Sequence, residues 1–377
     1  MRERAQYQNP MKIIHTADLH LDSPFEALSP EKARQRRSEQ RALLAAIADL
    51  VRTESADLVL LAGDLLDSEN SYYETGEELV NALRSIDAPV VISPGNHDYY
   101  CGRSPYARLK FPQNVYVFRH SGIECIDFSK RGFRVFGAAF TDRYSAPLLD
   151  GFSVDKKHNI VDIMCIHGDV GNENSNYNPI SIEQISKSNV DYFALGHVHS
   201  ASGLQKSGNT YYSYPGCPEG RGFDETGAKS VNIITIDKSG TKLATVNVAK
   251  RKYEKLVIDV SGMSPLYAIK MALPDKTVSD VYSIVLKGTA DEDIDVVKLH
   301  DALEPYFFAL KIKDETRQAF DIWSCSVNDT LRGLFISKLK QMYDASENEE
   351  DRKLIEQSAR WGIAALDNSE EVGIYGN

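Results

Sequence analysis

The sequence predicts an α/β fold whose strands form a mixed sheet or two packed sheets. Short β-branched runs end abruptly in polar residues, which is typical of buried strands, and helical stretches separate the first three of them. At about 150 residues per domain, a chain of 377 residues is long enough for two domains. The expected core strands are Lys12–His15, Asp57–Leu61, Pro89–Ile92, Asp162–Ile166 and Asp191–Leu195.

Helices are expected between the first three of these strands. One covers Pro30 to Glu54, and the next covers Glu74 to Ile86, where Leu79 and Leu83 are spaced as on one helix face. Three runs joined by short turns are expected to form an antiparallel insertion beside the parallel core: 115–118, 123–128 and 133–140. Later strands, with a hairpin between the last two, are expected to close the first domain: 211–214, 230–236 and 242–248.

Four segments are expected along the chain. Residues 1–10 are polar and patternless, which is typical of a disordered extension, and residues 11–250 form the first domain. Residues 251–327 are expected to form a small α+β unit, and residues 328–377 are helical in two pieces split by the acidic stretch 346–351. The elements expected in the α+β unit are strands at 256–260, 281–286 and 308–312 and helices at 265–272 and 296–303.

Composition and charge exclude several classes of protein. A hydrophobic fraction of 42% is too high for a disordered chain, and the longest mostly apolar stretch, Ala42–Val51, is about half the roughly 20 residues of a membrane span. The five cysteines are widely spaced without a C-x-x-C pair, so reduced thiols are expected. No secretory signal opens the chain, and the expected location is the cytoplasm. A net charge of −11 repels nucleic acid at long range, so any DNA binding needs a local basic patch or bound cations.

Side chains that can bind metals follow the expected strands. Five of the nine histidines lie there, together with aspartates and one asparagine. Because the carboxyl ends of neighbouring strands in an open α/β sheet meet at one crevice, these residues are expected to share a site. The segments are Asp18-Leu-His20, Gly63-Asp64-Leu-Leu-Asp67, Gly95-Asn96-His97-Asp98, His167-Gly168-Asp169 and Gly196-His197-Val-His199.

These residue types indicate a site for divalent cations. Carboxylate oxygens, an amide oxygen and neutral imidazoles suit Mn²⁺, Fe²⁺ or Zn²⁺, and seven candidate ligands are too many for one ion. Two ions about 3.5–4 Å apart can hold a bridging hydroxide, aim it at phosphorus and neutralise the developing charge, which favours phosphoester hydrolysis. With Asp64 as the bridge, the two ligand sets are Asp18, His20 and His199, and Asn96, His167 and His197.

The series D-x-H, G-D-x-x-D, G-N-H-D, H-G and G-H-x-H, in this order, resembles the calcineurin-like metallophosphoesterase superfamily. KIIHTADLHLDSPF at Lys12–Phe25 and SYPGCPEGRGFDE at Ser213–Glu225 look like its DNA-repair exonuclease branch, the SbcD/YhaO-like proteins. The resemblance covers roughly residues 11–250. It implies an α/β/β/α sandwich of two sheets with a smaller C-terminal α+β cap domain.

The resemblance also implies roles for individual residues. It gives the seven residues above as metal ligands and His97 as a non-ligand that stabilises the transition state or protonates the leaving oxygen. It implies that Asp98 orients His97. Asp67 stands where archaeal and eukaryotic repair nucleases commonly have a second histidine, so the details of leaving-group catalysis stay open.

Several other residues have two readings. Asp67 is expected either to support the site or to be an ordinary polar residue. Arg221, in the Gly-rich loop, is expected either to contact substrate or a neighbouring domain, or to have no such role. Both residues are candidates for substrate binding. His15 is expected to be a packing residue. A solvated helix face, with contact to a phosphate backbone as the alternative, is expected for Arg34, Arg36, Arg37 and Arg41.

Three functions are weighed. The leading one is a two-metal phosphodiesterase acting as a DNA exonuclease or endonuclease in repair, with Mn²⁺ preferred over Fe²⁺ or Zn²⁺. The alternative is a phosphomonoesterase or small-nucleotide phosphodiesterase, which the acidity favours slightly, and the third is a non-catalytic scaffold. The expected partners are DNA, an SMC-like coiled-coil ATPase and a second copy of the chain, with no membrane. One apolar stripe is expected to be either core or a docking face for the ATPase: Leu331, Leu334, Phe335, Leu339, Met342 and Tyr343.

Overall fold

The computed structural model describes residues 10–68, 72–290, 292–318, 322–323 and 330–366. The described chain divides into two compact units. The first contains the chain up to Val257 with Leu273–Val285 and His300–Lys313, and the second contains Ile258–Ala272, Leu286–Leu299 and the described residues from Asp314 onward. The predicted extension lies outside the described residues except for residue 10, and the predicted domain boundaries stay predictions. Among the described helices, none has both the length and the apolar character of a membrane span.

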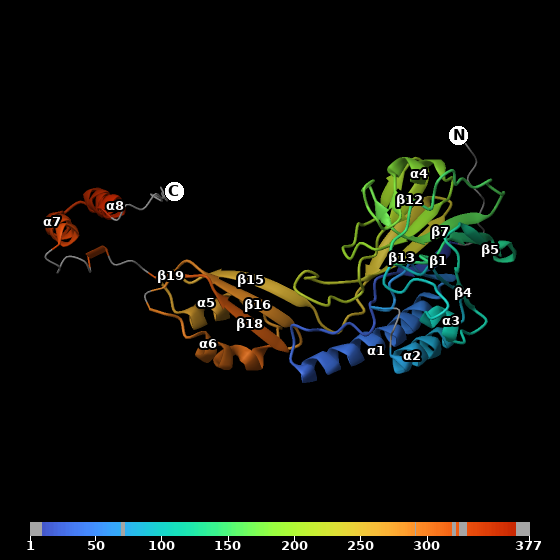
Figure 1. The fold of residues 1–377 in the computed structure, drawn as a ribbon, viewed down its shortest axis with the longest axis horizontal. Coiled ribbons are helices and arrows are strands. Elements are labelled where there is room, and N and C mark those ends of the chain that lie inside the picture. Colours follow the sequence, from blue (N-terminus) through green and yellow to red (C-terminus); the bar gives the residue numbers. More distant parts are fainter. Residues whose placement is uncertain (1–9, 69–71, 291, 319–321, 324–329, 367–377) are drawn as a thin grey trace. The chain divides into compact units, whose positions relative to one another are not determined.

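One six-stranded sheet lies in the first unit, in the order β14-β13-β1-β2-β3-β4. Three of its strands, β13, β1 and β4, are labelled in Figure 1. Strands β1 to β4 are parallel, whereas β13 and β14 add antiparallel strands beside β1. Ile13 and Ile14 are fully buried in two different hydrophobic clusters, so both faces of β1 are covered. The bounds are β1 (Met11–Thr16), β2 (Leu58–Leu61), β3 (Val90–Ile92), β4 (Val115–Val117), β13 (Val231–Asp237) and β14 (Gly240–Val246).

A second six-stranded sheet has the order β11-β12-β10-β7-β6-β5. Its four central strands are parallel, and β5 and β11 are antiparallel edges. Leu60 of the first sheet and Ile163 of the second lie in one hydrophobic cluster, so the two sheets pack face to face as predicted. The bounds are β5 (Glu124–Phe128), β6 (Phe133–Gly137), β7 (Val161–His167), β10 (Tyr192–Gly196), β11 (Gln205–Ser207) and β12 (Thr210–Ser213).

Helices cover the outer faces of the two sheets. α1 (Pro30–Glu54) has the predicted bounds, because Ser29 caps its first turn at Lys32 and the left-handed Ser55 (φ 50°) ends it. α2 (Tyr73–Arg84) packs its buried Leu79 in the same cluster as Leu44 of α1. The second sheet is covered by α4 (Ile182–Lys187), and α3 (Pro105–Arg108) is a single turn.

The predicted insertion at 115–140 is wrong as a single unit. β4 pairs in parallel with β3 of the first sheet, whereas β5 and β6 belong to the second sheet. Only the β5–β6 pair is antiparallel, and β6 continues in parallel with β7. The local pattern correctly indicated three strands, but strand pairing depends on residues elsewhere in the chain.

His15 is a structural residue, as expected. Its ring is fully buried, Nδ1 lies 2.7 Å from the Tyr192 hydroxyl, and Nε2 lies 3.1 Å from the Leu195 carbonyl oxygen. Burial lowers the pKa of His15 to about 3. The neutral ring therefore links β1 of one sheet to β10 of the other.

The predicted solvated face is wrong for Arg36. Its side chain is fully buried, and Nη1 lies 2.9 Å from carboxylate oxygens of both Glu39 and Glu219. Arg251 also donates to Glu39, with Nε 2.6 Å from Oε2. A buried charge needs such partners, and Glu219 and Arg251 lie far away in sequence, so the local helical pattern could not indicate them.

The remaining elements follow the predicted α+β order. One sheet has the order β15-β16-β18, and the short strands β17 and β19 are paired. The bounds are β15 (Tyr253–Asp259), α5 (Pro265–Ala272), β16 (Val281–Lys287), β17 (Thr289–Ala290), α6 (Val296–Leu303), β18 (Ala309–Asp314) and β19 (Arg317–Gln318). Two helices follow, α7 (Leu331–Ala345) and α8 (Glu349–Leu366).

The predicted apolar stripe on α7 is divided between core and surface. Phe335 and Leu339 pack on the cluster that contains Ile336 of α7 and Ala359 of α8. By contrast, Leu331, Leu334 and Met342 are 73%, 62% and 50% exposed. Among the described residues, the stripe therefore serves as core on one side and presents exposed apolar side chains on the other.

Replacing Leu339 with Glu is expected to loosen the α7–α8 pair by about 1–3 kcal/mol, because a charge would enter its hydrophobic cluster. Leu334→Glu is the matched control on the exposed side and should change stability by less than about 0.5 kcal/mol. Chymotrypsin cleavage rates and thermal melts of the two variants test this. Equal sensitivity of both variants would contradict the division of the stripe.

Candidate metal centre

The seven predicted ligands lie at or just beyond the carboxyl ends of strands from both sheets. The two sheets end at the same place, so residues separated by up to 181 positions become neighbours. Asp18 and His20 follow β1, Asp64 follows β2, Asn96 follows β3, His167 ends β7, and His197 and His199 follow β10. Five of the seven side chains are buried, and the last two histidines are half-buried.

The backbone at the site takes left-handed turns. Positive φ angles occur at Asp18 (54°), His20 (44°), Asp64 (51°) and His197 (110°). Such angles are uncommon outside glycine and cost on the order of 1–3 kcal/mol each, so the surrounding fold must hold them. Gly63 also has positive φ (93°), and any side chain there would contact the His167 ring.

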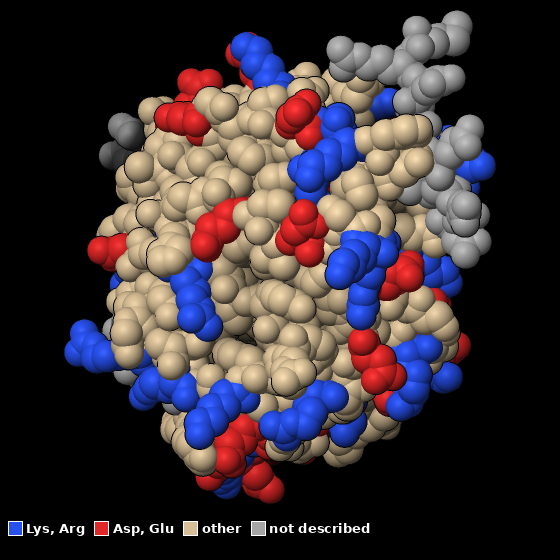
Figure 2. All heavy atoms as spheres, turned by 90° about the vertical axis from the view of Figure 1, so that its right-hand side faces the viewer, with Lys and Arg blue, Asp and Glu red and all other residues tan. Residues whose placement is uncertain are grey.

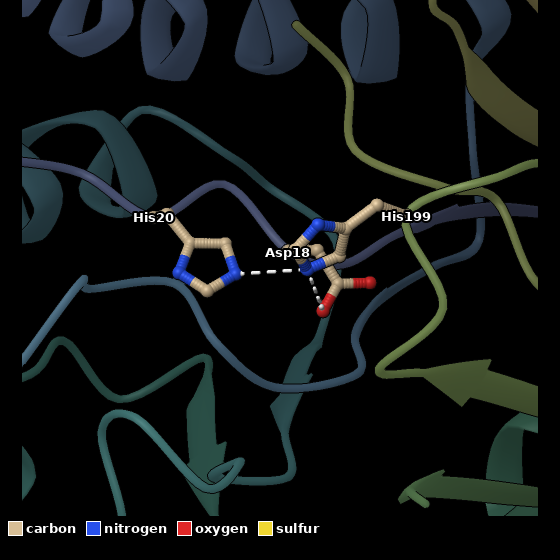
Figure 3. A group of neighbouring side chains, drawn as sticks. All are labelled: Asp18, His20 and His199. Carbon is tan, nitrogen blue, oxygen red and sulfur yellow. Dashed lines mark hydrogen bonds and ion pairs between the residues drawn. The ribbon is translucent and has the colours of Figure 1, made fainter. Parts of the chain in front are cut away.

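One half of the site consists of Asp18, His20 and His199 (Figure 3). The Nε2 atoms of the two histidines face each other at 3.2 Å, and His199 Nε2 lies 3.9 Å from Asp18 Oδ1. His20 Nε2 also lies 3.7 Å from Asp64 Oδ2. Two imidazole nitrogens and a carboxylate that converge in this way form a donor set for a cation.

The other half contains Asn96, His167 and His197. His167 Nε2 lies 3.0 Å from Asn96 Oδ1 and 3.4 Å from Asp64 Oδ2. His197 Nδ1 lies 3.3 Å from the same Asn96 oxygen. Asp64 Oδ2 thus faces a histidine from each half, which is the placement that a bridging ligand requires.

Hydrogen bonds outside the site orient three of these rings. His20 Nδ1 lies 3.0 Å from Asp67 Oδ1, and His199 Nδ1 lies 2.7 Å from Glu225 Oε1. His167 Nδ1 lies 2.9 Å from the Ala62 carbonyl oxygen. Each Nδ1–H therefore donates outward, which leaves Nε2 as the ring nitrogen that faces the centre. This arrangement fixes the tautomer that metal binding needs.

The charge states of the site fit a divalent ion. Burial lowers the pKa of His20 and of His197 to about 4, so both rings are neutral donors at pH 7. Burial raises the pKa of Asp18 to about 6. Although burial opposes it, the Asp64 carboxylate raises the pKa of His167 to about 9. A proton on His167 thus offsets the buried negative charge in the absence of another cation.

This charge balance predicts opposite pH dependences for folding and metal binding. The pKa of His167 lies above its ordinary value of 6.5, so its protonation stabilises the metal-free fold below pH 6.5, and this stabilisation is lost as pH rises through about 9. Metal affinity should increase over the same range, because an ion must displace that proton. The melting temperature of the metal-free protein should fall from pH 6.5 to 9, and the affinity for Mn²⁺, measured by titration, should rise over the same range. A flat affinity would contradict the assignment.

His97 lies at the edge of this cluster. Its backbone N–H donates to Asp64 Oδ1 at 2.9 Å, its Nδ1 lies 3.1 Å from the Asp67 carbonyl oxygen, and its ring packs edge-on against His20 at 4.7 Å. The residue is exposed. An exposed imidazole beside the buried donors can reach a substrate, and the predicted acid role stays a prediction.

The predicted role of Asp98 in orienting His97 is wrong. The fully buried carboxylate accepts hydrogen bonds from the Leu65 and Gly95 N–H groups at 2.7 and 2.8 Å and from the Tyr106 hydroxyl at 2.5 Å. Asp98 therefore ties together the turns that carry Asp64 and Asn96. Local adjacency to His97 suggested a partner, but the carboxylate points into the protein instead.

Asp67 and Arg221 both lie beside the His20–His199 half. Asp67 Oδ1 accepts a hydrogen bond from His20 Nδ1 and lies 3.3 Å from Arg221 Nη1. Their predicted contact with substrate stays a prediction. Glu225, which supports His199, was not identified from the sequence, although it lies in the Ser213–Glu225 segment that carries the family resemblance. An acidic residue at the end of that segment was the available signal.

Comparisons with known proteins agree with this geometry. Residues 11–201 match the family described as calcineurin-like phosphoesterase. The chain is 28% identical over 338 residues to the "Uncharacterized metallophosphoesterase YhaO" of Bacillus subtilis (strain 168), covering 85% of this chain and 81% of that protein. It is 26% identical to a subunit of the nuclease SbcCD from the same organism, covering 59% and 66% of the two chains. It is 21% identical to the "DNA double-strand break repair protein Mre11" of Saccharolobus solfataricus, covering 82% and 84%. The chain therefore belongs to the calcineurin-like phosphoesterase family and is a metal-dependent phosphoesterase.

Proposed function

We propose that the protein is a two-metal phosphodiesterase that cleaves DNA as an exonuclease or endonuclease in DNA repair. The observation that carries the proposal is the position of Asp64 Oδ2, which faces His20 at 3.7 Å and His167 at 3.4 Å. A carboxylate shared by two donor sets is typical of two-metal phosphoesterases. Family membership supports the phosphoester chemistry, and the names of the relatives support DNA as substrate.

The residues divide the work as follows. Asp18, His20 and His199 would hold one ion, Asn96, His167 and His197 the other, and Asp64 both. When bound, two divalent ions, Mn²⁺ first and Fe²⁺ or Zn²⁺ as alternatives, would lower the pKa of water and neutralise charge on the phosphoryl oxygens. His97, held by Asp64 and by the Asp67 carbonyl oxygen, would donate a proton from its ring to the leaving oxygen.

Surface charge is mixed on the face drawn in Figure 2. Lys and Arg side chains are frequent over its lower half, with Asp and Glu side chains among them, and the whole chain has a net charge of −11. Local positive charge is what phosphate-backbone binding requires. The net negative charge instead favours the alternative, a phosphomonoesterase or small-nucleotide phosphodiesterase.

Digestion of labelled DNA with Mn²⁺ tests the proposal. Linear end-labelled DNA reports exonuclease activity, and closed circular DNA reports endonuclease activity. Hydrolysis of p-nitrophenyl phosphate and bis-p-nitrophenyl phosphate reports activity on small esters. Mn²⁺-dependent release of nucleotides or fragments, lost with a chelator, is expected. Hydrolysis of the small esters with intact DNA would support the alternative, and no hydrolysis of any substrate would leave only a scaffold.

The proposed partners are DNA, an SMC-like coiled-coil ATPase and a second copy of the chain, and the proposed location is the cytoplasm. The similarity to one subunit of the SbcCD nuclease supports a multi-subunit assembly. Leu331 and Leu334 of α7, and Leu354 and Trp361 of α8, are at least half exposed, which is typical of an interaction surface. The test is whether the ATPase co-purifies with the Leu334→Glu variant as it does with the unchanged chain. Loss of the ATPase from the stable variant is expected.

A further inference from the structure

We infer that Arg221 is a positioning residue that holds the two carboxylates orienting His20 and His199. The inference rests on the proposed metal chemistry, because it concerns two of the proposed ligands. Arg221 would then support the half of the metal centre formed by Asp18, His20 and His199. Its removal should weaken metal binding even when no substrate is present.

The starting point is the dependence of both histidines on a carboxylate. His20 Nδ1 donates to Asp67 Oδ1 at 3.0 Å, and His199 Nδ1 donates to Glu225 Oε1 at 2.7 Å. These bonds aim the two Nε2 atoms at each other, 3.2 Å apart (Figure 3). If either carboxylate moved, its histidine could rotate or change tautomer, and the donor set would open.

Arg221 joins the two carboxylates. Its Nη1 lies 3.3 Å from Asp67 Oδ1, and its Nη2 and Nε lie 2.6 and 3.2 Å from Glu225 Oε1. The Arg221 backbone N–H also donates to Glu225 Oε2 at 2.7 Å. A planar guanidinium offers donors in several fixed directions, so it can hold two carboxylates in a set relation, which an ammonium group cannot do.

The charge of Arg221 is also needed. Glu225 is 4% exposed, and Asp67 is 25% exposed. A carboxylate with so little access to water needs a positive charge beside it, and the guanidinium lies within 3.3 Å of both. Arg221 therefore supplies charge as well as hydrogen bonds to the two carboxylates that the histidine rings face.

The loop that carries Arg221 is itself anchored. Buried Arg36 of α1 lies 2.9 Å from Glu219 and donates to the Gly220 carbonyl oxygen at 3.2 Å. Cys217 N–H donates to the His199 carbonyl oxygen at 3.2 Å. The position of Arg221 thus follows from contacts made by the residues that lead into it.

The other half of the site uses different support. His167 Nδ1 bonds to the Ala62 carbonyl oxygen, and His197 Nδ1 faces Asn96. Arg221 should therefore affect one ion much more than the other. This asymmetry distinguishes a positioning role from a general effect on folding.

Metal binding of the full chain with Arg221→Ala tests the inference. Mn²⁺ titration and elemental analysis after desalting should show one ion retained and the affinity for the other reduced about 10–100-fold, which is typical when an outer partner of a ligand is removed. The electron paramagnetic resonance signal of a coupled Mn²⁺ pair should give way to that of isolated Mn²⁺. Arg221→Lys should restore little, because the charge returns without the planar fork. Arg84→Ala, at an exposed arginine of α2 bonded to Asn81, is the matched control and should bind both ions normally.

Several results would overturn the inference. Two ions bound with unchanged affinity in Arg221→Ala would do so, and a raised KM with full metal content would show that Arg221 contacts substrate instead. Loss of both ions together would show a general structural role. If Arg221→Ala does not fold, Glu225→Gln and Asp67→Asn must each weaken one ion selectively for the inference to stand. Failure of the unchanged chain to bind divalent ions would overturn the proposed function itself, which separates the two failures.

Discussion

Replacing Asp64 with Ala is expected to abolish hydrolysis and to remove both metal ions. Oδ2 faces His20 and His167, and Oδ1 accepts the His97 N–H at 2.9 Å, so one side chain serves both halves of the site. Water cannot replace a shared charged ligand without weakening both ions. Elemental analysis after desalting and hydrolysis of bis-p-nitrophenyl phosphate measure the two losses.

Asp64→Asn is the matched control for this change. Asn tolerates the left-handed backbone at position 64 (φ 51°) and can still accept the His97 N–H, whereas Ala adds backbone strain. Loss of metal in both variants would therefore be due to the missing charge. Two ions still bound in either variant would show that Asp64 does not bridge.

Replacing His97 with Ala is expected to lower turnover about 10²–10⁴-fold, the usual contribution of a positioned acid or base, while both ions stay bound. His97 is exposed and holds its place through the Asp67 carbonyl oxygen and the His20 ring, beside the seven proposed ligands. It also lies close enough to His20 and Asp67 for these three to hold an ion, so metal content distinguishes the two roles. Turnover of a substrate with a poor leaving group, measured beside metal content, tests this role. A smaller loss with a good leaving group would point to proton donation.

His120→Ala is the control for the His97 substitution. His120 is also an exposed histidine, and the Glu124 carboxylate lies 4.0 Å from its ring. Its removal should leave turnover and metal content unchanged. Loss of metal in His97→Ala would make His97 a ligand and would contradict the proposed division of roles.

The sequence predicted the elements that local chemistry determines. α1 begins and ends at the predicted residues because a serine cap and a left-handed stop lie at its ends. The core strands appear within two residues of their predicted limits because buried β-branched runs are distinctive. The five motifs also predicted a shared site, from the convergence of strand ends within one open sheet. The structure brings the motifs together from both sheets, because residues after β1 and β3 lie against residues at the ends of β10 and β7.

What the sequence could not predict depends on contacts between distant residues. The assignment of β4 to one sheet and of β5 and β6 to the other is set by strand pairing. The acceptor role of Asp98 depends on backbone N–H groups up to 33 residues away, and burial of Arg36 depends on Glu219, 183 residues away. Glu225 supports His199 although it lies 26 positions further along the chain, beyond β11 and β12. None of these pairs leaves a periodic signal in one sequence.

The left-handed backbone at His20 and His197 has a consequence for how the site could be lost in evolution. Histidine at φ 44° or 110° carries backbone strain that glycine would not. Side-chain contacts offset this strain more at His20, which is fully buried and bonded to Asp67, than at His197, which is half-buried. A lineage that no longer needed the proposed ligands would therefore be expected to accept glycine first at position 197.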